Sequence, residues 1–357
     1  MSVATCIATA SGSVTCTISP TTAQVDLHDV LAEAQAVNAS LSTTSPMIII
    51  AYGGAGGHGQ GFDDEHQGDG GAAGQGGQAQ MTTTVDSFAN AYLRTLLFVY
   101  FGGQGSSEHY GGKGGASTVV SVDDLSMMGA STANVLLCAG GGGGGSDDTG
   151  SAQAFGGGNG GSATSSLGHA SAGAGEDGHS SATFASDTPA GGGVGGANGV
   201  GGAGGTANSK ENIDGKAGTD GMGGIGGAVH LQDGPSTPTF WTNFSAPTNS
   251  LGAAAAPPIP IGLLGGQGGE GEYRDDTDAD LDGSQIGAGG GGGGGYGGGG
   301  GGGGAGAGTN AEANSGGGGG GGGTYAAAST VTRVAPPYTV PSSNSGQGYV
   351  MIIFPEG

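Results

Sequence analysis

Basic residues are scarce in this sequence. Six Lys and Arg residues stand against 29 Asp and Glu residues among 357, which gives a formal net charge of −23 at pH 7. Proteins that bind DNA or RNA use Lys and Arg to neutralise phosphates, and anionic lipids attract basic segments for the same reason. We therefore expect no nucleic-acid partner and no binding to anionic lipid. An acidic surface instead favours solubility and attracts cations.

Long hydrophobic runs, aromatic residues and cysteines are also few. Met47–Tyr52 and Leu96–Phe101 are apolar but too short to cross a bilayer, which takes about 20 residues. We therefore expect no membrane insertion. Three cysteines are too few for a disulfide-rich scaffold. Residues 1–20 have neither a basic region nor a continuous apolar region, so we expect an extracellular or virion-surface protein that is released without a standard signal peptide.

Glycine, in contrast, supplies 92 of the 357 residues. Collagen is excluded because the glycines come in runs and only 13 prolines are present. Apolar segments instead lead directly into glycine: Met47–Tyr52, Leu96–Phe101 and Val135–Ala139 are each followed by a glycine tract, and Gly348–Phe354 closes the chain. Short apolar strands separated by long insertions predict a mainly β protein with one β-sandwich. We expect Gly348–Phe354 to pair in the same sandwich as Met47–Tyr52.

The first 45 residues differ in composition from the rest. Val3–Ala10 and Ser13–Ser19 predict a hairpin, which places Cys6 and Cys16 nearly opposite one another. The two cysteines either form a cross-strand disulfide or are two small buried hydrophobic residues. One short α-helix is expected from Thr21 or Thr22 through Ala39. We assign residues 1–45 to an attachment or assembly module and residues 46–357 to a glycine-rich β-sandwich domain.

The glycine tracts have a period of three. Val194, Ala197 and Val200 interrupt one tract at every third position, and Met222 and Ile225 repeat the spacing in another. Three residues per turn is the period of the polyproline-II helix, which polyglycine also adopts. The spacing predicts a bundle of polyglycine-II helices inserted into the sandwich. The alternative is a flexible linker, which is the usual behaviour of glycine-rich sequences.

These segments resemble a known family. Leu97–Gly105, Gly111–Val120, Val135–Gly143 and the closing Gly348–Phe354 are similar to the glycine-rich domain of bacterial and phage surface proteins and of anaplastic lymphoma kinase receptors. The resemblance implies a jelly-roll sandwich like that of tumour necrosis factor, with a hexagonal polyglycine-II bundle. In its glycine-rich segments joined by loops, the chain also resembles the adhesins of T-even-type phages. The receptors have a signal peptide, a membrane anchor and more cysteines, so we do not expect a signalling receptor.

Motifs for catalysis are not convincing in this sequence. GxGxxG arises by chance in a chain so rich in glycine, and Gly112-Lys113 is followed by Gly114 rather than by the Ser or Thr of a P-loop. We therefore expect no enzyme activity. Asp278, Asp280 and Asp282 precede Gly283 and resemble the first half of a Ca²⁺-binding loop, although the twelfth position is Gly289 instead of Glu. The alternative is a solvated acidic loop.

The expected function is surface binding by a virion protein, such as a phage tail-fibre or adhesin component. Its predicted partners are a host receptor or glycan, other virion subunits and further copies of the chain. The connecting segments Phe62–Gln67, Ser106–Tyr110, Ser162–Pro189, Leu231–Ala256 and Glu270–Ser284 are the expected contact loops, and the aromatic residues in them are the candidate binding residues: Phe184, Phe240, Trp241, Phe244 and Tyr273. Packing of these aromatic residues against the bundle is the competing explanation. The alternative function is a structural subunit of a cell-surface filament or matrix.

Overall fold

In the part of the chain that the structure describes, twelve strands form two six-stranded sheets, with two short helices beside them. The computed structural model describes residues 3–10, 12–20, 24–59, 71–107, 111–125, 134–146, 156–179, 192–205, 217–218, 223–224, 289–296, 317–332 and 344–356. Sheet A contains, in spatial order, β1 (Ala4–Ala8), β2 (Val14–Ile18), β12 (Tyr349–Phe354), β4 (Met47–Tyr52), β5 (Gln78–Thr83) and β9 (Ser162–Thr164). Sheet B contains β10 (Ser171–Gly173), β11 (Thr324–Ala326), β8 (Val135–Ala139), β7 (Thr118–Ser121), β6 (Leu96–Tyr100) and β3 (Gln24–Asp26).

The two sheets form a sandwich-like core. Alternate residues of β4, such as Met47 and Ile49, join residues of sheet B such as Val120 and Leu136 in one buried apolar cluster. The intervening residues Ile48 and Ile50 are also buried, on the other face of sheet A. Burial on both faces explains why β4 is a continuous apolar run rather than an alternating one. The predicted mainly β sandwich is therefore confirmed at this level.

Strand β12 lies between β2 and β4 in sheet A. Ile352 of β12 is opposite Cys16 of β2 on one side and Ile49 of β4 on the other, both in antiparallel register. The predicted pairing of the closing strand with Met47–Tyr52 is therefore confirmed. The hairpin of the proposed attachment module, residues 1–45, belongs to this same sheet and the same core as residues 46–357.

The N-terminal hairpin contains the disulfide. Cys6 and Cys16 are directly opposite in the antiparallel β1–β2 pair and are joined by a disulfide bond. Of the two alternatives left open by the sequence, the disulfide is the one in the structure. Gly12 in the connecting turn has φ +81°, a conformation that glycine adopts at little cost.

The helices differ from the sequence predictions in two ways. Helix α1 covers Leu27–Val37 and begins after Asp26, whose side chain accepts a hydrogen bond from the backbone N–H of His28. A start at Thr21 or Thr22 is therefore wrong. A second helix, not predicted from the sequence, follows β5: α2 (Val85–Tyr92) is capped by the Thr84 hydroxyl, which accepts from the Ser87 N–H at 3.0 Å.

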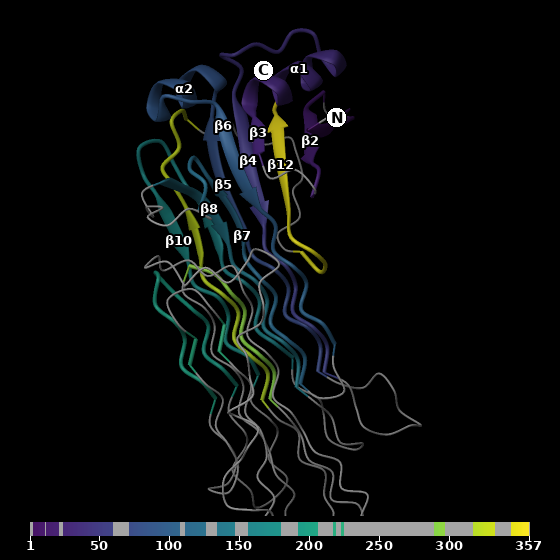
Figure 1. Cartoon of the computed structure of the whole chain (residues 1–357), viewed down its shortest axis with the longest axis vertical. Helices are drawn as coiled ribbons and strands as arrows, with labels where there is room; N and C mark the ends of the chain where they lie inside the picture. Colours follow the sequence, from purple (N-terminus) through teal and green to yellow (C-terminus); the bar gives the residue numbers. More distant parts are fainter. Residues whose placement is uncertain are drawn as a thin grey trace, which may run out of the picture.

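Glycine-rich segments continue away from the sheets. Figure 1 shows the two sheets in the upper part of the molecule and the segments running side by side below them. We call the following described residues the glycine segments: 53–59, 71–77, 101–107, 111–116, 140–146, 156–161, 174–179, 192–205, 289–296 and 317–323. Most of their backbone hydrogen bonds join one segment to another, and segment 192–205 also folds back on itself, with Val194 donating to Ala203.

Candidate functional site at the distal end of the glycine segments

The segment 140–145 contacts other glycine segments on all sides. Its N–H groups donate in turn: Gly141 and Gly144 to segment 289–296, Gly142 and Gly145 to segment 53–59, and Gly143 to segment 156–161. Its carbonyls accept from three further segments, 71–77, 111–116 and 317–323. Every third residue therefore faces the same neighbour, and six segments surround this one. Such lateral bonding satisfies backbone groups that have no partner within their own segment.

Glycine is required here for close approach. A Cβ on Gly144 would lie 1.9 Å from the carbonyl oxygen of Gly112, and one on Gly319 would lie 2.1 Å from that of Gly291. Real Cβ atoms do not come so close to backbone, so any larger residue would push the segments apart. Among the described residues, positive φ occurs in glycine only at Gly12, Gly168 and Gly199. The glycines of segment 140–145 therefore reflect packing and not a left-handed backbone.

Threonine hydroxyls join the sheets to the glycine segments. The Thr324 hydroxyl accepts from the Gly140 N–H at 2.9 Å and donates to the Gly161 carbonyl at 2.7 Å. The Thr118 hydroxyl accepts from the Gly102 N–H at 3.0 Å. Both threonines are fully buried. They satisfy backbone groups at the level where strand pairing ends and lateral glycine pairing begins.

The glycine segments end in pairs on the side away from the sheets, which we call the distal end. Gly59 donates to Gly71 at 3.1 Å, and Lys113 donates to Ser106 at 3.1 Å. In the same way Gly178 donates to Gly193 at 2.8 Å. The described chain thus leaves and re-enters at neighbouring positions on this one end (Figure 1). An end where many chain segments emerge together is a natural place for a binding surface, because loops on a rigid scaffold commonly carry function.

Polar side chains also make hydrogen bonds between the glycine segments. Asn159 accepts from the Gln75 N–H through Oδ1 at 2.8 Å, and its Nδ2 donates to Glu176 at 2.7 Å. The Asp177 carboxylate accepts from the Gly195 N–H at 2.8 Å. No group of three His, Cys, Asp or Glu residues suited to a metal ion occurs among the residues that the structure describes.

The residues predicted to bind lie outside the described residues. Phe184 falls between residues 179 and 192, where the chain leaves and re-enters the distal end. The other seven fall between residues 224 and 289: Phe240, Trp241, Phe244, Tyr273, Asp278, Asp280 and Asp282. Their roles, and the Ca²⁺ site, stay predictions. The expected contact loop Ser162–Pro189 is wrong in its first part, because residues 162–164 and 171–173 form β9 and β10.

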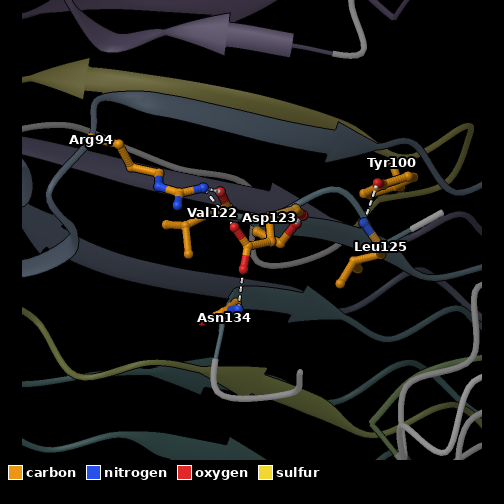
Figure 2. A network of polar contacts seen from close by, with 7 residues as sticks. Arg94, Tyr100, Val122, Asp123, Leu125 and Asn134 are labelled. Carbon is orange, nitrogen blue, oxygen red and sulfur yellow. Dashed lines mark hydrogen bonds and ion pairs between the residues drawn. The ribbon is translucent and has the colours of Figure 1, made fainter. Parts of the chain in front are cut away.

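A polar network lies at the other end of sheet B, between β7 and β8. Arg94 donates to the Asp123 carboxylate at 2.6 Å and to the Val122 carbonyl at 2.8 Å, and Asn134 donates to the other oxygen of Asp123 (Figure 2). The Tyr100 hydroxyl donates to Asp124 at 2.6 Å and accepts from the Leu125 N–H at 2.7 Å. These bonds fix the chain after β7. The network is a structural anchor, and no sequence motif indicated it.

Two titratable side chains, Cys138 and Tyr52, are buried and have raised pKa values. Burial raises the pKa of the Cys138 thiol to about 12, because the thiolate is not solvated inside sheet B. Burial also raises the pKa of Tyr52, which stacks on Tyr349 with ring centroids 4.4 Å apart. A thiol with a raised pKa is a poor nucleophile. Cys138 is therefore not an activated residue.

Neither described helix has the length and apolar character needed to cross a bilayer. No protein-family model matches the chain, and comparison with curated proteins finds no significant match.

Proposed function

We propose that the glycine segments are polyglycine-II helices packed as a hexagonal bundle on a jelly-roll sandwich. The proposal rests on the segment 140–145, where every third N–H faces the same neighbour and six segments lie around one. A threefold helix with a rise of about 3.1 Å per residue produces this pattern, since its side positions repeat every third residue. The tumour necrosis factor-like topology is part of the same proposal.

We further propose that the protein is a non-enzymatic virion surface protein, a tail-fibre or adhesin component that binds a host receptor or glycan. The observation that carries the proposal is the distal end, where the chain leaves and re-enters the glycine segments at neighbouring positions. Phe184 falls between the paired ends Gly178 and Gly193. Phe240, Trp241 and Phe244 fall between residues 224 and 289, after Gly224, whose carbonyl accepts from the Gly292 N–H. The resemblance to glycine-rich phage and bacterial surface proteins supports the same function.

A scaffold of laterally bonded glycine segments suits this task physically. Binding costs free energy when loops must be ordered, and a rigid base lowers that cost by fixing where each loop begins and ends. Variation in the connecting segments leaves the hydrogen bonds between segments unchanged, because those bonds use backbone atoms. Binding specificity can therefore change without loss of the fold.

The test is a cell-binding assay with purified, fluorescently labelled protein on a panel of bacterial strains. We expect saturable binding to a subset of strains, and loss of that binding in a triple variant, Phe240→Ala, Trp241→Ala and Phe244→Ala, whose melting temperature is unchanged. The matched control is Leu93→Ala, which removes an apolar side chain that is 90% exposed at the end of α2, away from the distal end. Absence of binding to every strain, together with filaments of purified protein under the electron microscope, would contradict an adhesin and favour the structural filament.

A further inference from the structure

Strand β1 is the outer strand of sheet A. It pairs with β2 on one side, and no described strand lies on its other side. Thr9 donates to Ser13 and Ser19 donates to Val3, so the odd-numbered residues make the hydrogen bonds to β2. Cys6 and Cys16, with Cα atoms 4.0 Å apart, occupy the closely spaced position between two such bonded pairs. The backbone groups of Cys6 and Ala8 therefore point outward, away from β2.

Strand β1 itself lacks the sequence features that usually prevent an edge strand from pairing with another chain. Natural edge strands carry a charge, a proline or a bulge. Here the first charged residue of the sequence is Asp26, the first proline is Pro20, and the β1–β2 register is continuous over Ala4–Ala8. Ile7 lies on β1 with 60% of its side chain exposed. An uncharged edge strand with an exposed Ile side chain can pair with a strand of another chain.

The net charge of the chain favours a second copy as the partner at the β1 edge. Two copies with a net charge of −23 repel each other, so they approach best through surfaces that carry no acidic residue. Strands β1 and β2 carry no charged side chain, and the Glu356 carboxylate beside Gly12 lies at the turn that joins them. The disulfide holds β1 on β2, so that the edge is already formed. An edge strand is also self-complementary, because a twofold axis pairs it antiparallel with its own copy.

We propose that β1 pairs antiparallel with β1 of a second copy of this chain, so that sheet A continues across a twofold axis. The pairing uses the outward N–H and carbonyl groups of Cys6 and Ala8, and it places Ile7 of each copy beside the other chain. This proposal deepens the expected self-association by naming its interface, and it does not depend on host binding.

The test is sedimentation equilibrium of the full, oxidised chain and two variants. The wild type is expected to dimerise. Ala8→Pro removes the outward N–H of Ala8 from each copy, and no hydrogen bond between β1 and β2 is lost. Ile7→Lys places a positive charge on each β1 edge. Each change is expected to weaken the dimer about tenfold or more. Leu93→Lys adds the same charge at another exposed apolar position and should leave the dimer unchanged.

Two results would overturn the interface. One is a wild type that stays monomeric at the highest concentration measured. The other is a dimer that both β1 variants retain at wild-type strength. Circular dichroism of Ala8→Pro and Ile7→Lys verifies that each variant is folded, so that loss of the dimer is not loss of the sandwich. Cell binding is measured separately, so a monomeric protein that binds cells contradicts the interface alone.

Discussion

Gly142 packs so closely against Gly74 that a Cβ on Gly142 would lie 2.0 Å from the Gly74 carbonyl oxygen. The two residues are far apart in the sequence and belong to segments that leave β8 and lead into β5. Their contact shows what glycine does in this protein. It lets backbones approach at a distance that no other residue permits, so that N–H and carbonyl groups pair between segments.

We predict that Gly142→Ala lowers the free energy of unfolding by about 3 kcal/mol, because the added methyl group forces apart backbones that have no room to move. Gly103→Ala is the matched control: a Cβ there meets nothing within 4 Å, and Gly103 has no positive φ. That variant should change stability by less than about 1 kcal/mol, in the stabilising direction, since alanine restricts the unfolded chain. Urea unfolding of both variants measures the difference; equal stabilities would mean that Gly142 is not packed.

The disulfide between Cys6 and Cys16 should stabilise the whole sandwich. The bond closes a short loop in the unfolded chain, which corresponds to about 2–3 kcal/mol. We therefore expect the double variant Cys6→Ser, Cys16→Ser to melt at a lower temperature than the oxidised wild type. Adding dithiothreitol should lower the melting temperature of the wild type toward that of the variant and leave the variant unaffected. A wild type that is insensitive to the reductant would contradict this role.

Strand β12 joins β2 to β4 inside sheet A, so its removal should unfold the domain. A chain that ends at Gln347 lacks Val350, Ile352, Ile353 and Phe354, all buried, and leaves β2 and β4 without their shared neighbour. We expect this chain to lose cooperative thermal unfolding. A chain that ends at Phe354 keeps the strand and is the control. A truncated protein that melts like this control would show that β12 is dispensable.

Alkaline pH should destabilise the protein through Cys138. The folded state holds this thiol protonated, with a pKa raised to about 12 from its usual value near 9. The stabilisation is complete below the unfolded pKa and is lost as pH rises from about 9 toward 12, because the unfolded chain releases the proton first. Unfolding in urea at several pH values should show a steeper loss in the wild type than in Cys138→Ala. Identical slopes would contradict the raised pKa.

The strands could be predicted from sequence where a residue run is apolar on both faces. Met47–Tyr52 and Val135–Ala139 are buried at every position, so their apolar runs are unbroken and their limits agree with the structure. The three-residue strands β9 and β10 have no such signal, because Ser162–Thr164 and Ser171–Gly173 consist of Ser, Thr, Ala and Gly and contain one buried residue, Ala163. Only pairing with β5 and β11 makes them strands.

Two missed features had local signals. In α2, Val85, Phe88 and Tyr92 recur at helical spacing after Thr84, which is a good N-cap residue. In the tract Gly191–Thr206, the residues Asn198 and Gly199 have φ +50° and +79° and reverse the chain, so that Val194 donates to Ala203. Asn-Gly is a strong hairpin signal. The period of three is real in the sequence, but this tract is two antiparallel segments rather than one.

The partners of each glycine segment could not be predicted, because glycine has no side chain that specifies a neighbour. Segment 140–145 bonds to residues as distant as Gly57 and Gly322, and only the sheets that hold the segment ends determine these pairs. The positions of the candidate binding residues in space could not be predicted for the same reason. Sequence locates them in connecting segments, and their positions in space depend on which segment ends are neighbours.

Amide hydrogen exchange of Gly141 through Gly145 tests the central claim most directly, since these N–H groups donate to three different segments. If the glycine segments form an ordered bundle, nuclear magnetic resonance of the oxidised protein will show these amides exchanging about a thousandfold or more slower than in an unstructured chain, like the amides of β4. Exchange at the rates of an unstructured chain, while β4 stays protected, would show that the sandwich carries flexible linkers and would contradict the account.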